Sequence, residues 1–143
     1  MSQTELLEAV ASLIEDEDAV ADQLVDLLQR RDGQLGLLLR VLRRRPEMFV
    51  PHVMQGARLY SAPKAIDPKT AELAAIAAAA ALMCEHCLEA HMKAARRKGA
   101  TLEEIFDVLL VAGAVAESST LSDAFRKFRQ LEGNLGSAEN DLA

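Results

Sequence analysis

The cysteine and histidine side chains of this sequence are concentrated in one short segment. The run MCEHCLEAH, which begins at Met83, holds both cysteines and two of the three histidines of the 143-residue chain. On an α-helix, Cys84, Cys87 and His91 would lie within about 60° of one another, whereas His86 would point elsewhere. The spacing therefore predicts a dithiol with a histidine one turn beyond it.

This arrangement is suited to thiol chemistry. The thiolate is the reactive form of cysteine, and an ordinary thiol, with a pKa of about 8.5, is mostly protonated at neutral pH. A neighbouring imidazole or the positive end of a helix would make it reactive. Such a dithiol could attack a peroxide oxygen and then close to a disulfide through a sulfenic acid. It could equally attack a disulfide in another molecule.

The same residues have plainer interpretations. Free cysteine is often a small buried residue. Zinc could bind Cys84 and Cys87 with His91 or His86, but a closed structural site needs a fourth ligand, and His52 is the only other histidine. We expect neither a metal nor a cofactor. For His86, a position on the surface or in an interface is nearly as well supported as a catalytic one.

Apolar residues recur at helical spacing along almost the whole chain, and no stretch alternates convincingly with period two, which predicts an all-α protein. Capping residues predict helix starts after Ser2, Asp67 and Thr101, and Gly33 and Gly99 predict helix ends. The helix after Thr101 is expected to be interrupted at residues 118–120, and the chain from residue 133 is expected to be loose. The basic end of the motif helix, residues 93 to 98, is expected to be solvated.

Composition excludes some classes of function. The net charge is −6 and aromatic residues make up 3% of the chain, which argues against a nucleic-acid surface. The longest apolar run, residues 73–83, is shorter than the roughly 20 residues of a membrane span. Glu5 and Glu8 stand where a secretory signal needs basic residues. We therefore expect a cytoplasmic protein that binds neither nucleic acid nor membranes.

A family resemblance rests on the motif residues. Glu72 stands twelve positions before Cys84, and CEHCLEAH fits C-x-H-C-x-x-x-H. Over about residues 46 to 128, the sequence resembles the alkylhydroperoxidase D-like branch of the carboxymuconolactone decarboxylase family. The resemblance implies an all-α, single-domain bundle of about six to seven helices that forms a homotrimer or homohexamer. It divides the chain into accessory helices at 1–45, the family domain at 46–132 and a flexible tail at 133–143.

The resemblance also implies an activity, the reduction of hydroperoxides or disulfides by a peroxiredoxin-type CxxC enzyme. By carry-over, Cys87 attacks, Cys84 resolves, and His86 and His91 form a proton relay with Glu72 as general base. A lipoyl- or thioredoxin-like dithiol would regenerate the enzyme. The alternatives are a non-redox relative acting on a small lactone or carbon acid, against which the paired cysteines argue, and a non-catalytic helical module.

Two points of geometry stay open. A helix starting near Cys84 would place that sulfur at the positive end, whereas Cys87 has His91 one turn away, so the residues alone do not decide which sulfur attacks. In one unbroken helix, Glu72 would lie about 18 Å along the axis and about 120° around it from Cys84. We expect the helix to break near Met83 and fold back; the alternative is that Glu72 serves a neighbouring subunit.

Overall fold

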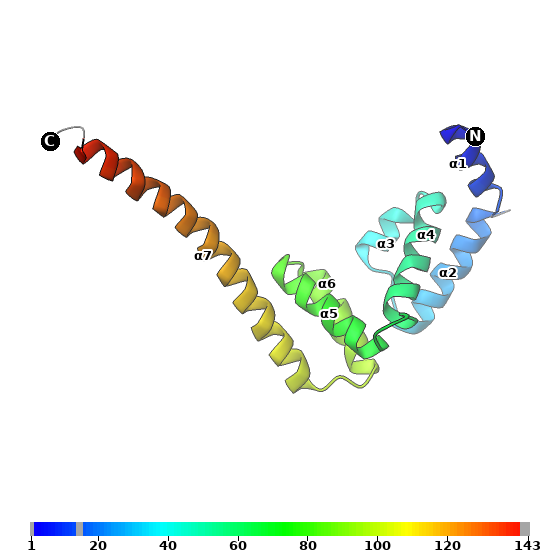
Figure 1. The fold of residues 1–143 in the computed structure, drawn as a ribbon. Coiled ribbons are helices and arrows are strands. Elements are labelled where there is room, and N and C mark those ends of the chain that lie inside the picture. Colours follow the sequence, from blue (N-terminus) through cyan, green and yellow to red (C-terminus); the bar gives the residue numbers. More distant parts are fainter. Residues whose placement is uncertain (1, 14–15, 141–143) are drawn as a thin grey trace. The chain divides into compact units, whose positions relative to one another are not determined.

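The computed structural model describes residues 2–13 and 16–140, with side-chain exposure through residue 133. Within these residues the regular structure is helical, with seven α-helices and one π-helical turn, and no strand occurs among them (Figure 1). The all-α prediction is thus confirmed. The chain divides into two compact units, residues 1–63 and 64–143.

The first unit contains α1 (Gln3–Ala11), α2 (Glu17–Asp32), α3 (Leu37–Leu42), α4 (Pro46–Gly56) and the π-helical turn η1 (Ala57–Ser61). Its core forms where Ala21 of α2 meets Phe49 and Val50 of α4, all at most 1% exposed. Pro46 takes the first helical position of α4, where its missing N–H costs no hydrogen bond. Arg43 joins α2 through Asp18 and Asp22, and the hydrogen bond to Asp22 is the main cause that raises the pKa of Arg43.

The second unit contains α5 (Pro68–Ala81), α6 (Glu85–Arg97) and α7 (Leu102–Asn140). α5 packs against both α6 and α7. The core consists of Ile76 of α5, Ala95 of α6, Ala100 of the following loop and Ile105 of α7. Asp67 caps α5 by accepting the backbone N–H groups of residues 69 and 70, and Gly99, with φ of 88°, ends α6, both as the sequence predicts.

One predicted boundary is wrong, because α7 runs without interruption through residues 118–120. The sequence suggested a break there because serine and threonine hydroxyls compete for backbone groups. In the structure, the Thr120 hydroxyl donates to the carbonyl oxygen of Ala116, 2.9 Å away, which satisfies it inside the helix. The helix also continues through Gly133 to Asn140, so residue 133 does not end it.

A band of large apolar side chains on α7 is exposed. We call it the apolar stripe of α7; its members fall within about 140° of the helix circumference and are Leu102, Phe106, Leu110, Leu121, Phe125, Phe128 and Leu131. By length and composition alone, residues Leu102–Gly133 could cross a membrane, and no other described helix meets that test. Core helices of soluble proteins also meet it, so the expectation of no membrane contact stays a prediction.

Candidate active site

The chain reverses direction between α5 and α6, within the second unit. α5 ends at Ala81, and Met83 takes the left-handed conformation with φ of 52°. The N–H of Cys84 then donates to the carbonyl oxygen of Ala79 at 2.9 Å, which closes the turn. The predicted break near Met83 is confirmed. Because Glu72 and His91 lie at about equal distances along the chain from this reversal, the two packed helices bring them side by side.

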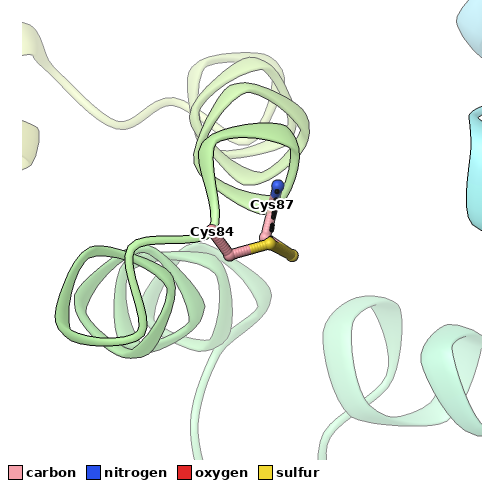
Figure 2. Close-up of a disulfide and its surroundings, with 2 residues drawn as sticks. All are labelled: Cys84 and Cys87. Atoms are coloured by element: carbon pink, nitrogen blue, oxygen red, sulfur yellow. Dashed lines mark hydrogen bonds between the residues drawn. A yellow bond between two sulfur atoms is a disulfide. The ribbon is translucent and has the colours of Figure 1, made fainter.

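The two cysteines lie at the start of α6 and are joined by a disulfide (Figure 2). Cys84 is the N-cap residue of α6, and its sulfur accepts the backbone N–H of Cys87 at 3.3 Å. Both side chains are half-buried. A sulfur at this position faces the unpaired N–H groups and the positive end of the helix dipole, which favour a thiolate once the disulfide is reduced.

Glu72 is the one charged residue that is fully buried among the described residues, at 3% exposure. Each of its carboxylate oxygens has a different partner on α6 or at its end. Oε2 lies 2.7 Å from Nδ1 of His91, and Oε1 accepts from Nζ of Lys98 at 2.5 Å. Desolvating a carboxylate is costly unless it is paired and hydrogen-bonded, and here both conditions are met.

Lys98 is the site residue that sequence reasoning missed. It was expected to lie at the solvated end of α6, but its side chain is 24% exposed and paired with Glu72. A signal for it was present, because Lys98 follows His91 by seven residues and Cys87 by eleven. At 100° per residue the three lie within about 40° on one helix face. Positive charge is common at the end of a helix, so residue type alone does not distinguish Lys98 from its solvated neighbours.

His86 lies elsewhere. Its side chain is exposed in the first turn of α6, away from the face shared by Cys87 and His91. Its imidazole is near Glu89, whose pKa is lowered mainly by the hydrogen bond from Lys93 and to the least extent by His86. The structure therefore brings Glu72 and His91 together but does not bring His86 to them.

A second ion pair fixes α7 beside the site. Nζ of Lys69, one turn before Glu72 on α5, donates to Oε1 of Glu104 at 2.7 Å. This hydrogen bond is the main cause that lowers the pKa of Glu104 and raises the pKa of Lys69. Glu104 also forms the predicted capping box with Thr101 at the start of α7.

The arrangement combines two chemical capacities. The sulfurs of Cys84 and Cys87 form a disulfide across a Cα–Cα distance of 5.3 Å, which lies within the usual range for such a bond. One turn from Cys87 lies His91, whose ring is oriented by a buried carboxylate. Among the described residues, no cluster of three or more His, Cys, Asp or Glu could hold a metal ion.

Comparisons with known proteins match this architecture. The model of the carboxymuconolactone decarboxylase family matches residues 51–130, which is more than half of the chain. The crystal structure of the alkylhydroperoxidase AhpD core from Rhodospirillum rubrum superposes with a TM-score of 0.64 and 26% sequence identity. That match covers 82% of this chain and 85% of the other.

A further relative is known from sequence. The "uncharacterized protein 4 in cox locus" of Paracoccus denitrificans is 35% identical over 68 residues. The match covers 48% of this chain and 61% of that protein, so less than two thirds of the relative is represented here.

Proposed function

Because the chain belongs to the carboxymuconolactone decarboxylase family, we propose that it is a thiol-dependent oxidoreductase that reduces hydroperoxides. The family and the matching fold indicate an enzyme of the alkylhydroperoxidase or carboxymuconolactone decarboxylase kind. The observation that carries the redox proposal is the pairing of Cys84 with Cys87 at the start of α6. Decarboxylation and proton transfer need no dithiol, which argues against a non-redox reaction.

The proposed reaction has two steps. The Cys87 thiolate attacks one oxygen of the hydroperoxide, the O–O bond breaks, and the alcohol leaves after taking one proton, which gives a sulfenic acid on Cys87. The Cys84 sulfur then attacks the Cys87 sulfur, the S–O bond breaks, and the hydroxyl leaves as water with a second proton. In total, two thiols and one hydroperoxide give one disulfide, one alcohol and one water.

Proton transfer is assigned to His91. It lies one turn beyond Cys87 on α6, and its Nδ1 faces the carboxylate of Glu72. Glu72 has both oxygens engaged, so in this proposal it orients and polarises His91 and does not itself receive the thiol proton. Cys84 acts as the resolving thiol. His86 is exposed in the first turn of α6, so in this proposal it joins the proton relay only when a bound substrate or partner covers it.

Regeneration requires a reductant. In the proposal, an external dithiol attacks the Cys84–Cys87 disulfide, forms a mixed disulfide and releases both thiols as its own pair is oxidised. The sulfurs are half-buried beside Leu82 and Met83, which are 78% and 89% exposed. This apolar edge at the reversal offers a lipoyl- or thioredoxin-like dithiol a surface next to the disulfide.

The function is tested by titrating the thiols of reduced protein before and after one equivalent of hydroperoxide. The wild type is expected to lose both thiols. Cys84→Ser should yield a trappable sulfenic acid on Cys87, whereas Cys87→Ser should not react. If both wild-type thiols survive, the peroxidase proposal is wrong and disulfide exchange or the non-redox reaction takes its place. A sulfenic acid in Cys87→Ser alone would reverse the two roles.

We further propose that the chain self-associates through the apolar stripe of α7, with a second copy as the occupant. Residues 102–120 carry only acidic charges, whereas residues 121–133 carry Arg126, Lys127 and Arg129 together with Asp123 and Glu132, which leaves one excess positive charge. Two antiparallel copies of α7 would therefore set the acidic segment of each copy against the weakly basic segment of the other while covering the stripe.

Light scattering without detergent tests this assembly. We expect a mass that is a multiple of the chain's 15.5 kDa, and a smaller mass for the variant Phe125→Glu, Phe128→Glu. The matched control is Ser122→Glu, which adds charge outside the stripe. A monomeric wild type would contradict the proposal, and binding to lipid vesicles would make a membrane the occupant.

A further inference from the structure

Met83 combines two features that packing within the second unit does not explain. Its side chain is 89% exposed, and no other large apolar side chain among the described residues is as exposed. Its backbone lies in the left-handed region with φ of 52°, which costs free energy in any residue that carries a side chain. An exposed methionine recovers little of that cost through burial. Backbone outliers of this kind cluster at functional sites, so this side chain calls for a functional explanation.

The place of Met83 in the chain connects it to the disulfide. It follows Leu82, the C-cap residue of α5, and precedes Cys84, the N-cap residue of α6. The peptide bond between Met83 and Cys84 is trans, so their Cα atoms are about 3.8 Å apart. A hydroperoxide that comes to the cysteine sulfurs therefore also comes close to Met83, whose unbranched side chain has three rotatable bonds.

We propose that Met83 is a modification site, at which a hydroperoxide oxidises the thioether to methionine sulfoxide and thereby weakens docking of the protein dithiol that regenerates the enzyme. This inference rests on the proposed function, which supplies the hydroperoxide and the reductant. The thioether sulfur attacks the terminal oxygen of the hydroperoxide, an S–O bond forms and the O–O bond breaks. The sulfur loses two electrons, the hydroperoxide is reduced to an alcohol, and the hydroperoxide's own proton ends on that alcohol.

Oxidation changes the apolar edge beside the disulfide. Leu82 and Met83 form this edge, next to the half-buried Cys84 and Cys87. A sulfoxide converts the flexible apolar side chain of Met83 into a polar one. Burying that group against the apolar surface of a reductant costs free energy unless it finds a hydrogen bond. The disulfide is unaltered, so a small dithiol that needs no docking surface still reduces it. Methionine sulfoxide reductases reverse the change.

The other methionines provide internal controls. Met48 and Met54 of α4 are 58% and 54% exposed, and both lie in the first unit. Met92 of α6 is half-buried. Exposure alone would make Met83 react about 1.5 times as fast as Met48, the ratio of 89% to 58%. A site to which hydroperoxide is drawn should exceed that ratio.

The first measurement uses the full-length protein in its disulfide form, so that no thiol consumes the reagent. The protein is treated with excess tert-butyl hydroperoxide, and the gain of one oxygen at each methionine is followed by peptide mass spectrometry. Met83 is expected to be oxidised first, and its rate relative to Met48 should exceed the exposure ratio. In urea the two should react alike. A ratio at or below the exposure ratio, or a preference that persists in urea, would overturn the site.

The second measurement compares regeneration before and after this treatment. The protein dithiol is thioredoxin or a lipoyl domain, whichever reduces the untreated disulfide faster, and dithiothreitol is the small dithiol. After oxidation, the rate with the protein dithiol should fall about fivefold, which corresponds to about 1 kcal/mol, and the rate with dithiothreitol should stay the same. Met83→Leu should lose no rate on treatment, because leucine is apolar and has no sulfur to oxidise. Met48→Leu is the matched control and should lose rate as the wild type does.

The outcomes separate this role from the proposed function. An equal fall with both dithiols, no fall with the protein dithiol, or a disulfide that neither protein reduces would overturn the docking role of Met83. Met83→Gln is a second variant, in which a polar amide stands in for the sulfoxide; without treatment it should be regenerated more slowly by the protein dithiol than Met83→Leu. If the proposed peroxidase function fails instead, the reduced wild type keeps both thiols in hydroperoxide, and the oxidation of Met83 is still measured on the disulfide form.

Discussion

Replacing Met83 by glycine should stabilise the protein. Met83 has φ of 52°, and a side-chain-bearing residue in the left-handed region costs about 1–2 kcal/mol. Glycine removes that cost but brings back about 0.5–1 kcal/mol through its greater freedom in the unfolded chain. The Met83 side chain is 89% exposed, so it gives up little packing. We expect a net gain of about 0.5–1 kcal/mol in the free energy of unfolding.

Urea denaturation of both proteins in the same redox state measures the difference, which corresponds to a rise of a few tenths molar in the midpoint. Leu82→Gly is the matched control, because Leu82 is 78% exposed but has an ordinary helical φ of −85°. That variant should lose about 0.5–1 kcal/mol. If Met83→Gly is destabilised as much as Leu82→Gly, the left-handed residue is not the strained point of the reversal.

Two further predictions concern the packing around the site. Ile76→Ala removes a side chain with 0% exposure from the core of the second unit, so the free energy of unfolding should fall by about 2–5 kcal/mol in denaturation experiments. Glu104→Gln tests the pair with Lys69: because the pKa of Glu104 is lowered in the fold, its stabilisation is present above about pH 4 and is lost as the pH falls through the folded value. The variant should therefore melt below the wild type at pH 7, and the two melting temperatures should converge near pH 3; an equal gap at both values would contradict the pairing.

The reversal could be predicted only through the family resemblance, which assigns Glu72 to the site, because a straight helix would keep that residue far from the cysteines. Its conformation could not be predicted, because the left-handed position holds methionine where glycine is usual. The helix starts after Asp67 and Thr101 were predictable, since a cap is a local pattern of side chain and backbone. Local patterns identify elements well but say little about a turn that packing imposes.

Two errors have the same origin. Residue type alone predicts a helix break at residues 118–120 and a solvated Lys98. Thr120 is satisfied by the carbonyl of Ala116, and Lys98 is bound to a carboxylate 26 residues earlier. The partner decides the outcome in both cases. Before the fold was known, only the helical register that Lys98 shares with His91 could have indicated that Lys98 faces Glu72.

Eight of the fourteen residues in α5 are alanine, and the buried ones include Ala71 and Ala79. A glutamate side chain is short, so its carboxylate reaches α6 only where the two backbones approach closely. Alanine permits that approach because it projects a single methyl group. The separation between the carboxylate and its two partners is thus determined by residues that have no functional group. A larger side chain at the buried Ala71 or Ala79 would push away a helix packed against α5, even with every motif residue retained.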